Sequence, residues 1–315
     1  MSLRLAVACG LSLGLLGAAP PLAAQDVHPT VPSEADVAIS EGRLADAESI
    51  LFGASSAAPH DPSARGALGM FLASRGRLKV GAVLLDETRQ FGGDAAVVDA
   101  RLARIYGWLG DWVSFAALKH YAATNPEHER ALWLSTHPTA HSGPDTVTVA
   151  LEPNEMAGLG RIVLSIGAAS ITVDIDPAVD GLVLPSNPEV TAESKQFGMH
   201  DSATVAVVYA AGIGELRLTN IPARLSPTAR PTVGLDVLAA FMPTFDAAQQ
   251  VLTLRQHPQP QDGTLLPLML GFPGISFAAR AGQPLVRMES AAGRAALRGS
   301  RWSFDLRRGA IVMLP

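Results

Sequence analysis

A glycine recurs at a fixed interval in the first half of the chain, and this interval constrains the fold more than any other feature. Gly42, Gly76 and Gly110 are spaced 34 residues apart, and each lies between two runs with helical hydrophobic periodicity. Glycine readily adopts the positive φ that ends a helix, so each one predicts a turn between two helices. Repeated helical hairpins bury their apolar faces by stacking, which predicts a helical array.

The array resembles the tetratricopeptide repeat over residues 34–127. The matching positions are Ala47, Ala54, Pro59, Leu68, Gly69, Leu102, Ala103 and Tyr106. Gly81 and Gly93 depart from the alanine and proline that the family prefers. The resemblance implies an all-α solenoid over residues 34–130 with a concave surface for a partner peptide. A helical cap that only supports the next domain is the alternative.

The N-terminus predicts export. Arg4 precedes an apolar run over residues 5–18, and the pattern is that of a signal peptide, residues 1–24, cleaved near Gln25. An uncleaved membrane anchor is the alternative. The single cysteine, Cys9, lies inside this segment, so the mature chain has no disulfide, which fits a bacterial periplasm. No later stretch is apolar for long enough to span a bilayer.

Charge and composition limit the partners. The net charge of −5 and the charged fraction of 17% argue against a nucleic-acid partner. Residues 131–145 contain proline, glycine and polar side chains, which predicts an inter-domain linker. His137 and His141 are four residues apart there, but Pro138 and Gly143 oppose a helix, so we expect no metal site. We expect no cofactor either.

From residue 146 onward, short β-prone runs alternate with turns, which predicts a small closed barrel over residues 146–257. One turn within it is rich in acids, because Asp174, Asp176 and Asp180 lie between two apolar β runs. Strands disfavour aspartate, and burying a carboxylate is costly. Such a turn either presents an acid in a cleft or is an ordinary solvated turn.

This region resembles the retropepsin-like aspartic proteases, in the single-barrel form of exported bacterial proteins. The stronger motif, TVGLDVL over residues 232–238, is similar to the family's apolar-apolar-Gly-x-Asp-x-Leu. Counting back from the run GLVL over residues 181–184 places the family's active-site aspartate on Asp176. In this family two chains, or two lobes, each supply one such acid, and the two carboxylates share a proton and activate water.

The resemblance also implies a flap hairpin and a substrate-binding cleft. Residues 205–218 occupy the place of the flap, with Gly212 and Gly214 at its bend. Together with Val233 and Gly234, these glycines are the expected substrate-binding positions. The implied partner is a peptide or protein, and the barrel offers a surface for a homodimer.

The active-site motif departs from the family. Where the family has Asp-Thr-Gly-Ala, this chain has Asp176-Pro177-Ala178-Val179. Pro177 has neither a hydroxyl nor a backbone N–H, and Ala178 adds a methyl group where only hydrogen fits. We therefore expect impaired catalysis at Asp176, with Asp174 and Asp180 as weaker candidates.

The last segment, residues 264–315, resembles a degenerate second lobe. Leu285-Val286-Arg287-Met288 is similar to the strand that leads into the family's aspartate, and Glu289 then occupies the acid position. Residues 302–314 echo the end of the first lobe. Glu289 would face Asp176, but its extra methylene disfavours a shared proton. A β tail that only extends the barrel is the alternative.

The sequence thus predicts a multidomain α plus β protein: a helical solenoid, a retropepsin-like barrel and a shortened second β lobe. The expected function is that of an exported aspartic-peptidase relative that has lost catalysis and keeps a peptide-binding cleft. A periplasmic scaffold that binds peptides through its helices is one alternative. An active endopeptidase with an unusual carboxylate pair is another.

Overall fold

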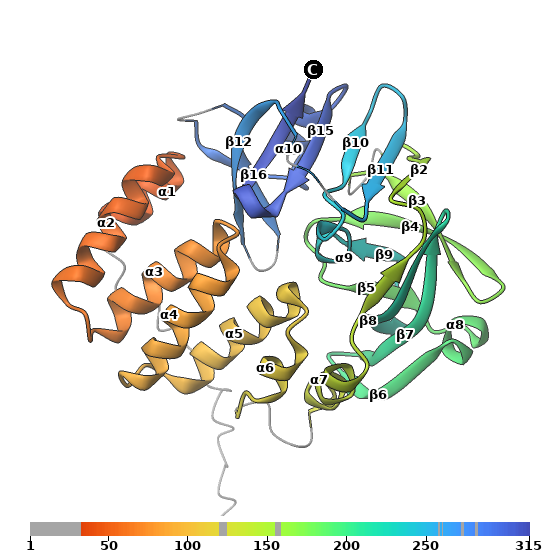
Figure 1. Ribbon diagram of the computed structural model, residues 1–315, viewed down its shortest axis with the longest axis horizontal. Coiled ribbons are helices and arrows are strands. Elements are labelled where there is room, and N and C mark those ends of the chain that lie inside the picture. Colours follow the sequence, from red (N-terminus) through yellow and green to blue (C-terminus); the bar gives the residue numbers. More distant parts are fainter. Residues whose placement is uncertain are drawn as a thin grey trace, which may run out of the picture.

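The computed structural model describes residues 33–119, 125–154, 159–257, 259, 261–271, 274–280 and 283–315. Within this part, the chain begins with helices and continues as β structure, so the α plus β class is confirmed (Figure 1). The predicted signal peptide, residues 1–24, lies outside the described residues. None of the described helices is long and apolar enough to cross a membrane.

The helical part is an ordered series in which consecutive helices pack on one another. Its members are α1 (Ser33–Ser40), α2 (Leu44–Ala57), α3 (Pro62–Ser74), α4 (Leu78–Gln90), α5 (Ala95–Leu109), α6 (Trp112–Ala116) and α7 (Pro126–Thr136). Gly42, Gly76 and Gly110 have φ of 74°, 79° and 64° at the turns, which confirms the positive φ predicted for them. Asp61 and Asp94 cap the starts of α3 and α5 by accepting backbone N–H bonds.

The segment predicted as a linker, residues 131–145, contains regular structure. Helix α7 continues to Thr136 and ends two residues before Pro138, which cannot continue a helix. Strand β1 (Ala140–Ser142) then pairs antiparallel with β8 (Leu216–Ser226). The helical part therefore passes into the β part through a paired strand.

One sheet has the strand order β1-β8-β5-β9-β4-β3-β7-β6, and the further pairing of β7 with β8 closes it into a barrel. Its remaining strands are β3 (Arg161–Ile166), β4 (Ala169–Asp176), β5 (Leu182–Pro185), β6 (Ser194–His200), β7 (Ala203–Ile213) and β9 (Thr232–Gly234), with α8 (Pro188–Ala192) before β6 and α9 (Leu235–Ala239) after β9. Strand β9 lies between β4, to which it is parallel, and β5, to which it is antiparallel. This pairing sets Gly234 opposite Asp176 at the end of β4.

The other sheet has the order β14-β13-β12-β16-β15-β10-β11-β2. It comprises β2 (Thr146–Ala150), β10 (Thr244–Asp246), β11 (Val251–Arg255), β12 (Thr264–Leu270), β13 (Ile275–Ala278), β14 (Leu285–Arg287), β15 (Arg301–Asp305) and β16 (Ala310–Leu314), with α10 (Ala291–Leu297) and the 3-10 turn η1 (Leu306–Arg308). Strands β10 and β15 lie side by side in it (Figure 1). Strands β16, β12, β13 and β14 follow beyond β15, and β11 and β2 follow beyond β10. We call this the seam sheet.

The seam sheet is built from two halves with the same plan. Thr244 pairs directly with Ser303, and outward from this pair β10, β11 and β2 correspond to β15, β16 and β12. Each half also has a short helix, α9 or α10, before its central strand. The edge of β10 that faces the second half is thus paired within the same chain.

The turns of the helical part dock on the second half of the seam sheet. A Cβ added to Gly76 would lie 2.1 Å from Leu306 O, and one added to Gly309 would lie 2.2 Å from Arg75 O. Arg75 donates from its guanidinium to Leu268 O and Gly309 O. These glycines therefore serve close backbone approach as well as positive φ.

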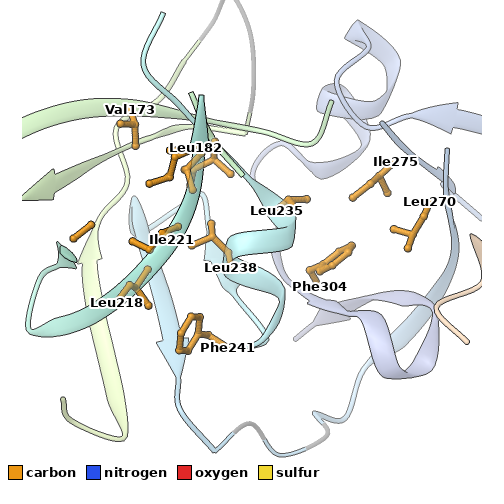
Figure 2. Packing of buried hydrophobic residues seen from close by; sticks show 14 of the residues in the cluster. Val173, Leu182, Leu218, Ile221, Leu235, Leu238, Phe241, Leu270, Ile275 and Phe304 are labelled. Atoms are coloured by element: carbon orange, nitrogen blue, oxygen red, sulfur yellow. The ribbon is translucent and has the colours of Figure 1, made fainter. Parts of the chain in front are cut away.

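A continuous hydrophobic core joins the two parts. It includes side chains of α4 to α7, such as Leu102 and Leu134, as well as buried side chains of both sheets. Figure 2 shows Leu235 and Leu238 of α9 among barrel side chains, and Phe304 of β15 on the other side. The helices and the β structure therefore fold against each other over a shared apolar surface.

Candidate functional site

Asp176, the first candidate, ends strand β4 and is only partly buried. Its Oδ1 accepts a hydrogen bond of 2.8 Å from Ala178 N, which fastens the turn that follows. Pro177, which lies between these two residues in the chain, is buried. The carboxylate of Asp176 thus has a turn-forming role, a common one for aspartate.

Asp174 is a structural charge. It is 6% exposed, and its carboxylate forms an ion pair with Arg230 and accepts a hydrogen bond from Asn154 Nδ2. A buried carboxylate needs such partners, because an unpaired one would cost several kcal/mol, on the order of 3–5. These contacts link β4 to the segment before β9.

Asp236 fastens the acidic turn, residues 176–181, from the other side. Both of its carboxylate oxygens accept from Gly181 N, at 3.0 Å and 2.8 Å. Burial and then the charge of Asp180 raise its pKa to about 7, while the backbone N–H groups of Gly181 and Val237 oppose the shift. A Cβ on Gly234 would lie 2.3 Å from Asp236 Oδ1, so a larger residue there would displace this carboxylate.

Asp180 connects this turn to the helical part. Its Oδ1 accepts a hydrogen bond of 3.1 Å from Trp108 Nε1 on α5. Part of the residue is exposed, yet burial of its carboxyl against neighbouring atoms raises its pKa; the Trp108 bond, Arg104 and Arg224 oppose the rise. The charge of Asp180 disfavours that of Asp236 across a space bordered by helix and sheet.

That space is a cavity of about 310 Å³ between α5 to α7 and the barrel. Its helical wall holds Arg104, Trp108, Trp112, Phe115, Glu127 and Arg130, and its barrel wall holds Asp180, Gly181, His200, Asp201, Arg224 and Asp236. Glu127 forms ion pairs with Arg130 and Arg224, which brings the two walls together. The indole N–H of Trp112 and Nε of Arg130 have no partner among the described residues.

A second cavity of about 300 Å³ adjoins the first and is more apolar. The two share five lining residues: Gly107, Trp108, Trp112, Pro222 and Asp236. The second continues past Leu218 and Ile221 to Phe241 and His141, whose rings lie 5.0 Å apart. We call the two together the boundary groove. It has a charged end and an apolar end.

The hairpin that reaches the boundary groove is β6–β7. Its tip, Asp201 and Ser202, has φ of 49° and 65°, and His200 and Asp201 line the charged end. The glycines expected at a flap bend lie elsewhere. A Cβ on Gly214 would contact Val147 and Val149 of β2, at 3.1 Å and 2.9 Å, so the tip of β7–β8 is packed on the seam sheet.

The remaining expected binding positions are Gly212, Val233 and Gly234. A Cβ on Gly212 would lie 2.3 Å from Ser165 Oγ of β3. Val233 is completely buried in the core, and Gly234 lies beneath the acidic turn. None of the three lines the boundary groove as the described residues define it. Their role in substrate binding stays a prediction.

In the second half of the β structure, Glu289 has the place that Asp176 has in the first, as the hydrogen bond of the preceding residue shows. Met288 N donates to Ile275 O before Glu289, as Ile175 N donates to Gly160 O before Asp176. The contacts of Glu289 are local, since its carboxylate pairs with Arg287 and lies near Gly274. Helix α10 begins two residues later, so no turn equivalent to residues 177–181 follows it. The described contacts do not bring Glu289 to Asp176.

Two features of the site were missing from the sequence prediction. Asp236 belongs to the TVGLDVL motif, but its carboxylate faces Gly181, a residue 55 positions earlier in the chain. Trp108 lies in a helical unit that the sequence predicted as a peptide-binding surface or a supporting cap, without a contact to the acidic turn. An acid inside an otherwise apolar motif was the one available signal for Asp236, because buried carboxylates need a specific partner.

Comparison with known proteins gives a weak likeness. No protein-family model matches the chain, and no curated protein does. Among solved structures it is similar to a retropepsin-like aspartic protease from Rickettsia conorii, with 14% identity and a TM-score of 0.28. The match covers 37% of this chain and 91% of the other.

Proposed function

We propose that this protein is an exported relative of the retropepsin-like aspartic peptidases that binds peptides in the boundary groove and has impaired peptidase chemistry. The observation that carries the proposal is the groove, where aromatic and charged side chains of α5 and α6 face the acidic turn and the β6–β7 tip. Aromatic side chains with a few placed polar groups are typical of binding clefts. An extended peptide would contact both walls.

The surroundings of Asp176 support impaired chemistry. General acid–base catalysis by this family needs a second carboxylate close enough to share a proton. The described contacts of Asp176 join it to Ala178 N, and Asp174 is neutralised by Arg230. Pro177 cannot offer the hydroxyl that locks two such turns together.

The helical part takes part in binding under this proposal. We regard it as a tetratricopeptide-like array whose third hairpin forms one wall of the groove. If the helices bind peptides on a surface of their own, as a scaffold would, loss of groove side chains will leave binding intact. Export to the periplasm is part of the proposal and is tested by fractionation and by the N-terminal residue of the mature chain.

The decisive experiment combines a binding assay and a cleavage assay on the mature chain. A library of unstructured decapeptides is screened by mass spectrometry for retention and for cleavage at pH 4 and pH 7. We expect retention without cleavage, and loss of retention in Trp108→Ala. The matched control is Val113→Ala, because Val113 lies on α6, is 65% exposed and does not line the groove.

Two results would contradict the proposal. Pepstatin-sensitive cleavage that disappears in Asp176→Asn would show that the peptidase chemistry is intact. Equal peptide retention by Trp108→Ala and the wild type would remove the groove as the binding site. A stable fold in both variants, checked by circular dichroism, keeps these results interpretable.

One observation favours a second candidate, an acid-dependent hydrolase that uses Asp180 and Asp236. Both acids line one cavity, and the charge of Asp180 contributes to the raised pKa of Asp236. This candidate predicts cleavage that is lost in Asp180→Asn and unaffected by Asp176→Asn. The binding proposal instead predicts no cleavage by any of these proteins.

A further inference from the structure

The charged end of the boundary groove presents a carboxylate beside an indole. Asp180 Oδ1 and Trp108 Nε1 are joined by a hydrogen bond of 3.1 Å, and both residues line this end. Asp180 is exposed and Trp108 is partly exposed, so a ligand can reach both side chains. An ionised carboxylate has about four acceptor positions, so it can accept further hydrogen bonds beside that of the indole. The pair therefore offers a cation an ionic partner next to an aromatic ring.

The charges that line this end fall into two groups. Glu127 forms ion pairs with Arg130 at 2.5 Å and with Arg224 at 2.7 Å, so two of the guanidinium groups share one carboxylate. The second group is acidic, because the charge of Asp180 contributes to the raised pKa of Asp236 across the same cavity. A ligand cation beside these two aspartates would lower their repulsion, whereas a ligand anion would increase it.

The surroundings of Asp180 point in the same direction. Burial of its carboxyl raises its pKa, and the bond from Trp108 and the charges of Arg104 and Arg224 oppose the rise without cancelling it. The arginines near Asp180 therefore offset only part of the cost of burying its charge. A further cation would stabilise the ionised carboxylate.

The shape of the groove suits a long side chain with an apolar stem. Trp108 and Pro222 are partly exposed and line both cavities, so they form a continuous surface from the charged end to the apolar end. Arginine can lay its methylene groups on such a surface while its charged head reaches a polar partner. At the apolar end, the partly exposed Leu109 and Val237 can contact an apolar neighbour in the peptide.

We propose that the boundary groove selects peptides by an arginine side chain whose guanidinium pairs with Asp180 and lies against Trp108. This inference rests on the proposed peptide-binding function and adds the substrate class to it. A guanidinium forms parallel hydrogen bonds with a carboxylate and packs flat on aromatic rings, which the compact ammonium of lysine does not. Asp180 is thus a specificity-determining residue, and the nearby charge of Asp236 adds to the preference for a cation.

The test compares two libraries of unstructured decapeptides at pH 7, which are identical except for arginine or citrulline at one central position. Citrulline has nearly the same shape as arginine but carries a neutral urea group. We expect the mature chain to retain the arginine peptides at least about tenfold more strongly. Asp180→Asn keeps an oxygen acceptor for Trp108 and removes the charge. It should abolish the preference and retain the citrulline peptides as the wild type does, which also shows that the variant is folded.

Glu215→Gln is the matched control, because Glu215 is an exposed acid in the turn between β7 and β8 and lines neither cavity of the groove. It should keep the full preference for arginine. Equal retention of both libraries by the wild type, or a preference that persists in Asp180→Asn, would overturn the inference. Stronger retention of a glutamate library would overturn it as well, and equal retention of a lysine library would overturn the choice of arginine.

The Trp108→Ala variant separates failure of this inference from failure of the proposed function. If Trp108→Ala loses both libraries while the wild type retains them equally, the groove binds peptides and only the arginine preference is wrong. If Trp108→Ala retains both libraries as the wild type does, or if the wild type retains neither, the groove is not the peptide site and the preference fails with it.

Discussion

The hydroxyl oxygens of Thr244 and Ser303 lie 2.6 Å apart in the seam sheet, where its two halves meet. Thr244 is 2% and Ser303 0% exposed. Thr244 Oγ1 also accepts from Arg255 at 2.8 Å and from Gln261 Nε2 at 3.2 Å, and Ser303 Oγ donates to Gln261 Oε1. A buried polar network of this kind stabilises one alignment of the two halves, because any shift leaves its members without partners.

Replacement of Ser303 should therefore destabilise the whole β structure. We expect Ser303→Ala to lower the free energy of unfolding by about 1–3 kcal/mol, because Thr244 and Gln261 each lose a buried partner. A double-mutant cycle with Thr244→Val should give a coupling of roughly 0.5–3 kcal/mol in urea unfolding. Thr148→Ala is the control: its hydroxyl bond to Thr253 lies in an exposed region, so the loss should be below about 0.5 kcal/mol. Equal losses in Ser303→Ala and Thr148→Ala would contradict this role.

The turn glycines allow a test of how the helices dock on the second half. Gly76→Ala should cost more than about 2 kcal/mol, because its methyl group would collide with Leu306 O in addition to the strain of positive φ. Gly110 also has positive φ but has open space around its Cβ position, so Gly110→Ala should cost only about 1 kcal/mol. Thermal unfolding of both variants measures the difference. Similar costs would mean that the contact between Gly76 and Leu306 adds no stability.

Much of the local structure could be predicted, because it depends on short stretches of the chain. The 34-residue spacing predicted the turns at Gly42, Gly76 and Gly110, since positive φ is a property of the residue itself. The order of helices before strands also followed from local periodicity. The end of α7 and strand β1 were missed, because β1 is short, exposed and stabilised only by pairing with β8.

The contacts of the candidate site could not be predicted in this way, because they join segments that are distant in the sequence. Asp176 was singled out by its alignment with a motif, but its bond to Ala178 N shows a local turn. The pKa of Asp236 is raised, and its carboxylate accepts from Gly181 N in the turn between β4 and β5. The contact between Trp108 and Asp180 depends on the angle at which the helices pack on the barrel. Hydrophobic periodicity gives no information about that packing angle.

The raised pKa of Asp236 predicts an unusual dependence of stability on pH. Its pKa is about 7 in the folded chain against 3.8 for an unperturbed carboxyl, so between these values the folded state binds more protons than the unfolded state. The contribution of Asp236 to the free energy of unfolding is therefore greatest below about pH 4. It decreases by roughly 1–4 kcal/mol as the pH rises to about 7. Urea unfolding of the wild type and of Asp236→Asn from pH 4 to pH 8 measures this contribution.

Asp236→Asn should remove that part of the pH dependence while keeping one oxygen acceptor for Gly181 N. Other carboxylates contribute to the wild-type curve, so the quantity that matters is the difference between the two curves. We expect the variant to be relatively more stable at pH 8 than at pH 4. A constant difference across this range would mean that Asp236 titrates near its ordinary pKa.

Trp108→Phe should raise the pKa of Asp180 further, because the indole N–H stabilises the charged form of this carboxylate. The phenyl ring keeps most of the apolar contact and removes only the donor. Carboxyl-carbon NMR of Asp180, followed against pH, measures the shift directly. Trp112→Phe is the matched control, since Trp112 lines the same cavity but its indole N–H has no partner among the described residues. If both variants move the pKa of Asp180 equally, the effect comes from lost packing, and the hydrogen bond does not connect helix α5 electrostatically to the acidic turn.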